Sequence, residues 1–111
     1  MRYGFYLPTR GPLGNPDDIS EIALAGERLG YSTMVFGDHI VFPVEVSSPY
    51  PYTVDGGFPG VGDAMEQLTL MSFVAGFTKT ARLVTSVMIL PHRNPLVTAK
   101  ILATIDVLSK G

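Results

Sequence analysis

The chain has 111 residues and a net charge of −2 at neutral pH, from 8 basic and 10 acidic side chains. This length suits one domain, and a charge so close to zero gives no electrostatic case for nucleic-acid binding. Hydrophobic residues make up 46% of the chain and charged residues 16%, which excludes an intrinsically disordered protein. The absence of cysteine also excludes disulfides and thiolate metal sites.

The N-terminal apolar run at residues 3–7 predicts a strand rather than a signal peptide. It is too short for a signal peptide, and Pro8 interrupts it. No apolar segment approaches the roughly 20 residues that a membrane-spanning helix needs. We therefore expect a cytoplasmic protein without a membrane partner.

The first 37 residues predict a strand–helix–strand unit. Asn15 can cap a helix and Pro16 suits its first position, while Gly30 fits the left-handed residue that ends one. Residues 32–37 form a short apolar run, typical of a strand buried on both faces. Two strands joined through a helix in this way pair in parallel with a right-handed crossover.

The second part of the chain predicts a long loop followed by two more helices and a strand. Residues 40–62 are irregular and rich in proline and aromatic residues, typical of a functional loop. Its aromatic side chains either form a lid over a flat ligand or pack the loop onto its own domain. Residues 63–66 predict a capping box that opens a helix. Residues 83–90 are the clearest strand, and Asn94 with Pro95 repeats the earlier cap.

Ligands of β/α proteins bind at the carboxyl ends of the strands, so the residues there are the candidates for chemistry. Both histidines of the chain, His39 and His92, follow predicted strands. His39 stands next to Asp38, an arrangement that suits a general acid or base with a tuned pKa. The alternative is that His39 only closes a turn by hydrogen bonding.

Other side chains at the same rim have two interpretations each. Arg10 and Arg93 either hold a phosphate or carboxylate near a helix N-terminus or are solvated loop residues. The hydroxyls of Thr85 and Ser86 interrupt an apolar strand, and buried hydroxyls need partners from a ligand or from the backbone. The acidic residues match no metal-ligand spacing, so we predict no metal site.

Several short motifs follow one another along the whole chain in a recognisable order. They lie at residues 3–5 and 7–8, 25–31, 37–39, 50–52 with 55–56, 83–90, 91–95, 99–100 and 103–109. Together they resemble the bacterial-luciferase-like family, and within it the coenzyme F420-dependent oxidoreductases.

The resemblance implies an α/β fold, a partial (β/α)8 TIM barrel with about the first three βα units and parallel strands. Residues 1–111 would then be the N-terminal portion of a luciferase-like barrel domain. The implied chemistry is hydride transfer between coenzyme F420 and a small organic substrate, with the cofactor ring at the strand C-terminal ends. His39 is implied as the acid/base or ring-contacting residue, and Asp38 as a hydrogen-bonding partner of the cofactor head group.

The family often carries a non-proline cis peptide in its third strand, and the matching position is Ser86-Val87. The resemblance thus implies that Thr85, Ser86 and Val87 bind the cofactor. The sequence departs from the family pattern at two places. The family usually has Gly-Thr where this chain has Val84-Thr85, and it usually reads Ser-Gly-Gly-Arg where this chain reads Ser-Lys-Gly at residues 109–111.

Two other functions remain open from the sequence. One is an FMN-dependent luciferase-like monooxygenase. The other is a non-catalytic fragment that acts as an oligomeric binding or assembly module, because a closed barrel needs roughly 200 residues or more. A few strands alone leave open sheet edges, and such edges invite pairing. We therefore predict a homo-oligomer.

Overall fold

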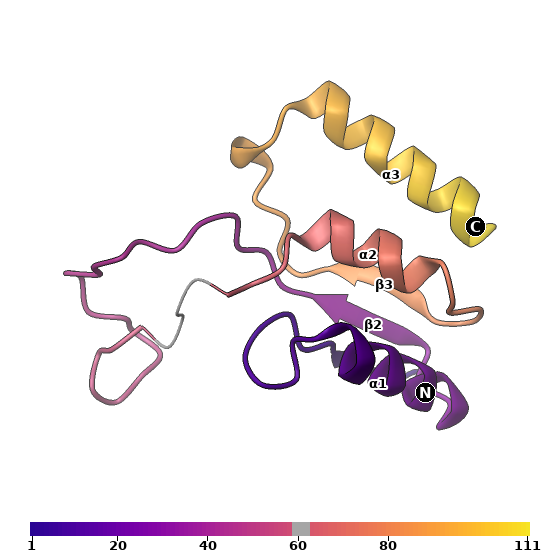
Figure 1. Cartoon of the computed structure of the whole chain (residues 1–111), viewed down its shortest axis with the longest axis horizontal. Coiled ribbons are helices and arrows are strands. Elements are labelled where there is room, and N and C mark those ends of the chain that lie inside the picture. The colour runs from indigo at the N-terminus through magenta and orange to yellow at the C-terminus, as the bar shows by residue number, and fades with distance from the viewer. Residues whose placement is uncertain (59–62) are drawn as a thin grey trace.

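The computed structural model describes residues 1–58 and 63–111 (Figure 1). The part of the long loop at residues 59–62 lies outside the described residues. The elements follow in chain order: β1 (Gly4–Tyr6), α1 (Pro16–Arg28), β2 (Thr33–Phe36), α2 (Gln67–Ala75), β3 (Arg82–Thr85), the 3-10 helix η1 (Leu90–His92) and α3 (Pro95–Ser109). The predicted succession of strand–helix units is confirmed.

The three strands of the described chain form one parallel sheet in the order β1-β2-β3. Tyr6 is paired with Val35, and Val35 with Val84, across the sheet. The helices lie on one side of this sheet, and the strands run toward the long loop that projects from the body (Figure 1). This is the arrangement of consecutive βα units in a β/α barrel, the fold that the resemblance implies.

The hydrophobic core fills the space between the sheet and the helices. Met34 and Phe36 of β2 are fully buried there, because alternate residues of a strand point to the same face. The apolar face of α1 contributes Ile19 and Ala23. The other buried apolar residues are Leu7, Leu68, Leu70, Met71, Val74, Ala75 and Ile105. Within the described ranges, no helix is long and apolar enough to span a membrane.

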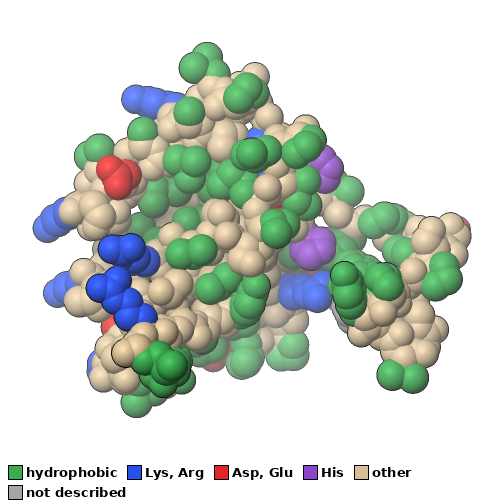
Figure 2. Space-filling model, turned by 180° about the vertical axis from the view of Figure 1, so that it is seen from behind, with side chains coloured by type: hydrophobic (Ala, Val, Ile, Leu, Met, Phe, Trp, Pro, Cys, Tyr) green, Lys and Arg blue, Asp and Glu red, His purple; other side chains and the backbone are tan. Residues whose placement is uncertain are grey.

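The opposite face of the sheet is open. Tyr6 is 65% exposed and Val84 is 40% exposed, and Val35 between them is only partly buried. Figure 2 shows hydrophobic side chains gathered over this face, seen from behind the helices. The expectation that residues 32–37 are buried on both faces is therefore wrong for this chain, since the described helices cover one face only.

The helix caps at the two Asn-Pro pairs are confirmed. The side-chain oxygen of Asn15 accepts a hydrogen bond of 3.0 Å from the backbone of Asp18. The side chain of Asn94 accepts bonds of 3.0 and 3.2 Å from the first amides of α3. Gly30 has φ of +85°, the left-handed conformation that glycine adopts without steric cost after a helix.

The predicted capping box at residues 63–66 is displaced. Helix α2 begins only at Gln67, and Glu66 is its cap, accepting a 2.7 Å bond from the amide of Thr69. Asp63 instead accepts a 3.0 Å bond from the backbone of Gly11. Both carboxylates can cap a free amide, so local sequence alone does not decide between them.

Strand β3 is shorter than the predicted strand at residues 83–90. The β-ladder ends at Thr85. The next residue, Ser86, still donates a backbone bond of 2.8 Å to the carbonyl of Phe36. The Ser86–Val87 peptide bond is cis, which confirms the position expected from the resemblance. Past the strand, Met88 still packs against the core, while Val87 and Leu90 are exposed. Apolar character therefore does not distinguish a ladder from an irregular segment.

Glu27 joins the end of α1 to the connection that enters β3. Its Oε1 atom accepts bonds of 2.9, 2.6 and 2.9 Å from the amides of Lys79, Thr80 and Ala81. Partial burial raises the pKa of Glu27, but these hydrogen bonds outweigh it, so the pKa lies below its ordinary value. The carboxylate thus holds a loop that would otherwise leave several amides unpaired.

Candidate active site

The carboxyl ends of the three strands are tied together by hydrogen bonds. Leu7, after β1, donates a 2.9 Å backbone bond to Val35, and Ser86, after β3, donates its backbone bond to Phe36. The hydroxyls of Tyr6 and Ser86 lie 2.8 Å apart. The segments that follow the strands, which carry the predicted site residues, therefore begin side by side.

The segment of Thr85, Ser86 and Val87 lies at this edge of the sheet. The partner of the Ser86 hydroxyl is the Tyr6 hydroxyl across the open face, a third possibility beside the ligand and backbone partners considered from the sequence. The side chain of Val87 is 67% exposed. Contact between this segment and a cofactor stays a prediction.

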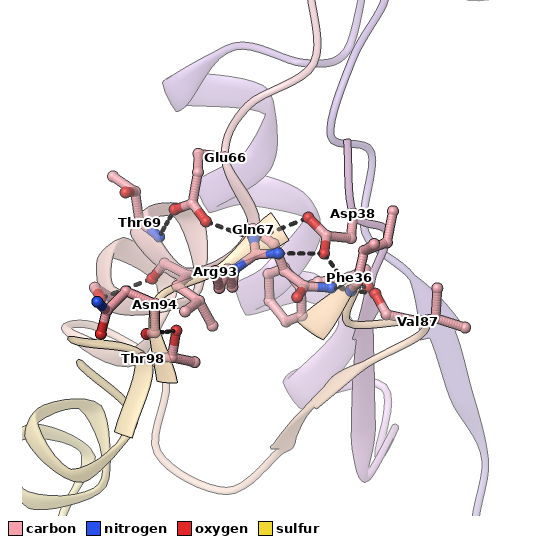
Figure 3. Close-up of polar contacts among 12 residues, drawn as sticks. Phe36, Asp38, Glu66, Gln67, Thr69, Val87, Arg93, Asn94 and Thr98 are labelled. Atoms are coloured by element: carbon pink, nitrogen blue, oxygen red, sulfur yellow. Dashed lines mark hydrogen bonds and ion pairs between the residues drawn. The ribbon is translucent and has the colours of Figure 1, made fainter. Parts of the chain in front are cut away.

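Asp38 lies at the centre of a buried ion-pair network (Figure 3). Asp38 is only 5% exposed as a residue, and its two carboxylate oxygens accept bonds of 2.5 and 2.9 Å from Arg93. The amide of Ile89 donates a third bond of 2.7 Å. Burial raises the pKa of Asp38, but the hydrogen bonds and charge of Arg93 and the Ile89 amide hold it below its ordinary value.

Arg93 binds carboxylates of its own chain. Besides Asp38, its guanidinium donates a 2.8 Å bond to Glu66 at the start of α2, and its side chain is 8% exposed. The interpretation of Arg93 as a solvated loop residue is therefore wrong. Hydrogen bonds to Asp38 raise the pKa of Arg93 above its ordinary value, although burial acts in the opposite direction. The network fixes the turn before α3 against the end of β2.

Gln67 is a residue of the site that the sequence did not reveal. Its side chain is fully buried, and its Nε2 atom donates bonds of 2.9 Å to the carbonyls of both Phe36 and Val87 (Figure 3). The amide thereby joins the end of β2 to the segment after β3. The available signal was a polar residue at the start of a helix whose following residues are mostly apolar.

His39 packs in an aromatic cluster with Phe42 and Phe58. Its ring is stacked on Phe42, with centroids 4.7 Å apart and an angle of 9° between the planes, and lies 6.1 Å from Phe58. Burial lowers the pKa of His39, the Arg10 cation lowers it further, and Asp38 acts in the opposite direction. Burial and the Arg10 cation thus favour the neutral imidazole, the form that can accept a proton.

The described part of the long loop packs its aromatic residues on one another. Tyr50 lies edge-on to Phe58 at 5.0 Å and to Tyr52 at 5.5 Å, and Phe58 continues the cluster toward His39. The structure thus places loop aromatics directly beside a site residue. In Figure 2 the histidine side chains, in purple, lie on the side of the molecule from which the loop projects.

In the two described ranges, no group of three or more potential ligands is placed to hold a metal ion.

The parallel sheet in chain order, its helices on one face and the polar residues at its carboxyl ends define a segment of a β/α barrel, with a candidate site where such proteins bind ligands. Comparison with protein families gives the particular class. The model of the luciferase-like monooxygenase family matches residues 1–111, and the chain belongs to this family.

Curated relatives of the chain come from mycobacteria. The uncharacterized protein Rv0940c of Mycobacterium tuberculosis and the uncharacterized protein Mb0965c of Mycobacterium bovis are each 37% identical to it over 81 residues. The match covers 71% of this chain and 28% of each relative. The matched region is thus less than a third of the length of these relatives.

Proposed function

We propose that this chain is the N-terminal part of a coenzyme F420-dependent oxidoreductase and carries part of the cofactor site. The reaction is hydride transfer between the cofactor and a small organic substrate. One observation in this chain of the luciferase-like family carries the proposal. His39 follows β2 and the Ser86–Val87 segment follows β3, and the backbone bond from Ser86 to Phe36 holds the ends of these two adjacent strands together. Residues 1–111 then form the first βα units of a longer barrel domain.

The residues present suit a flat heterocyclic ring. Sites for such ligands combine apolar surface with a few polar groups of fixed orientation. Val87 offers exposed apolar surface, and Thr85 and Ser86 precede it in the same segment. The cofactor supplies the hydride chemistry when bound, and the protein orients the partners.

His39 is proposed to hold or accept a proton beside the ring. Its neutral imidazole has a nitrogen able to accept, and its aromatic neighbours limit the access of water. A contact of Asp38 with the cofactor head group stays a prediction, because its side chain is shielded by the described residues. Both of its oxygens already accept bonds from Arg93. We propose that this pair orients the segment that carries His39.

A second candidate is an FMN-dependent monooxygenase, which the description of the matching family favours. The two are separated by titrating the chain with F420 and with FMN and following absorbance and fluorescence. Tighter binding of F420 supports the first proposal, and tighter binding of FMN supports the second.

The site assignment is tested with a pair of histidine variants. His39→Ala should weaken cofactor binding, while His92→Ala, which changes an exposed histidine of η1, should not. Equal binding by wild type and His39→Ala contradicts the role of His39. A chain that binds neither cofactor contradicts both enzyme proposals and favours the non-catalytic assembly module. For each of the three candidate functions, the F420-dependent oxidoreductase, the FMN-dependent monooxygenase and the assembly module, we infer a cytoplasmic location.

A further inference from the structure

We propose that Arg10 is a positioning residue for His39, because its guanidinium and the His39 imidazole rest on the same Phe42 and Phe58 rings. The three side chains come from separate places: Arg10 follows β1, and Phe42 and Phe58 stand at the two ends of the described loop. Sequence order alone would assign Asp38 as the electrostatic partner of His39. The folded chain adds Arg10, whose charge acts on His39 in the opposite direction to that of Asp38.

The geometry of the cluster couples Arg10 to His39 through shared aromatic rings. The guanidinium carbon of Arg10 lies 5.9 Å from the centre of Phe42 and 6.0 Å from the centre of Phe58. Both distances are within the range of a cation–π interaction. The imidazole stacks on the same Phe42 ring, and the two phenylalanines lie 5.6 Å apart. The cation and the imidazole therefore share one aromatic support.

The charges around the imidazole favour the neutral form. Asp38 is the carboxylate that acts on His39, but its oxygens are bonded to Arg93, and Glu66 lies beyond Arg93 in the same network. Among the described residues Arg10 forms no ion pair, and the nearby Asp63 carboxylate accepts a bond from the Gly11 amide instead. Its Nη1 atom is buried and, among the described residues, has no hydrogen-bond partner.

An uncompensated cation near a half-buried imidazole opposes a second positive charge there. The catalytic meaning of this arrangement rests on the proposed function, because only a neutral imidazole can take up a proton during hydride transfer. The arrangement itself requires no cofactor. It is therefore testable on the chain alone, and its test is independent of the cofactor titrations.

The experiment is an NMR titration of the His39 imidazole in the wild type, in Arg10→Gln and in Arg10→Lys. Arg10→Gln should shift the pKa of His39 upward, and Arg10→Lys should restore the wild-type value because it keeps the cation. His92 serves as an internal control, and Arg28→Gln, on the exposed end of α1, as a matched variant. An unchanged His39 pKa in Arg10→Gln, or an equal rise in Arg28→Gln, overturns the proposal.

A second measurement keeps the proposal testable if Arg10→Gln does not fold. In the wild type, the δ-protons of Arg10 should show nuclear Overhauser contacts to the ring protons of Phe42 and Phe58 and an upfield ring-current shift. Absence of both effects overturns the proposal. Failure of F420 and FMN to bind, with the Arg10 results as expected, contradicts the proposed function and leaves the role of Arg10 standing.

Discussion

Asp38 and Arg93, which are 55 residues apart in the chain, form an ion pair in which both carboxylate oxygens meet the guanidinium. The pair links the end of β2 to the turn before α3, so one contact fixes two of the segments at the candidate site. Such two-pronged pairs are more directional than single contacts. The Asp38 side chain is fully shielded from water, which makes its partner indispensable.

Arg93→Met should destabilise the chain strongly. The substitution leaves the buried Asp38 carboxylate without its cation, a change that costs roughly 3–5 kcal/mol in other proteins. The exposed Glu66 pair contributes little of this effect, because exposed pairs are weak. Urea unfolding followed by circular dichroism measures the loss, with Arg28→Gln as the control. A loss of less than about 1 kcal/mol would show that Asp38 does not depend on Arg93.

Gln67→Leu should also lower the free energy of unfolding. The variant keeps the side-chain size but removes both hydrogen bonds, to the carbonyls of Phe36 and Val87. The Phe36 carbonyl keeps its backbone bond from Ser86, so the loss comes mainly from the Val87 carbonyl and should be about 1 kcal/mol. Ser72→Ala, which removes only a bond to the Leu68 carbonyl one turn back in the same helix, is the control for substitution within α2. Equal stability of Gln67→Leu and wild type contradicts the assigned role.

The stability of the chain should depend on pH through Glu27. Its pKa is lowered in the folded chain from an ordinary value of about 4.5, so its contribution is present above that pH and is lost as the pH falls through the folded value. Glu27→Gln should therefore lower stability by about 1 kcal/mol at pH 7, and less on acidification. Unfolding midpoints between pH 7 and pH 3 check this, with the exposed Glu21→Gln as control. A loss that is the same at every pH would contradict it.

Gly26→Ala should destabilise α1, although alanine is the better helix former. A Cβ atom at this position would come within 2.4 Å of the Phe5 ring, which itself packs edge-on against Tyr31 at 5.2 Å. Overpacking of this kind costs about 1–3 kcal/mol, more than the helix propensity gains. Gly37→Ala is the control, because a Cβ there meets nothing within 4 Å. Thermal unfolding compares the two variants, and equal midpoints would refute the clash.

The chain should form a homo-oligomer through its open sheet edges. Within the described residues, β1 and β3 each have one side without a paired strand. Size-exclusion chromatography with light scattering should show a mass above that of one chain. Val84→Lys, which places a charge on edge strand β3, should shift the protein toward monomer, while Val107→Lys on α3 should not. A monomer at all concentrations would rule out this pairing.

Local signals in the sequence predicted the order of elements well. Asn15 and Asn94 cap helices through bonds to amides two or three residues away, so the relevant physics lies within a few residues. The end of β3 was not predictable in the same way. It depends on where Ser86 leaves the ladder with Phe36, a contact across 50 residues of sequence.

The sequence did not predict which side chains contact Asp38 and His39 in the folded chain. Asp38 and His39 are neighbours in the chain, which suggested that one acts on the other. In the folded chain Asp38 is bonded to Arg93, and His39 stacks on Phe42 near Arg10. Gln67 was missed for the same reason, because its two acceptors lie 31 and 20 residues away.

The order of strands in the sheet has a consequence for synthesis. Each described strand pairs with the next one along the chain, as β1 does with β2 and β2 with β3. Each strand can therefore pair with a neighbour that is next to it in the chain, without a strand from a distant part of the sequence. A sheet of this kind can assemble progressively as the polypeptide emerges from the ribosome, β2 being added to β1 and then β3 to β2.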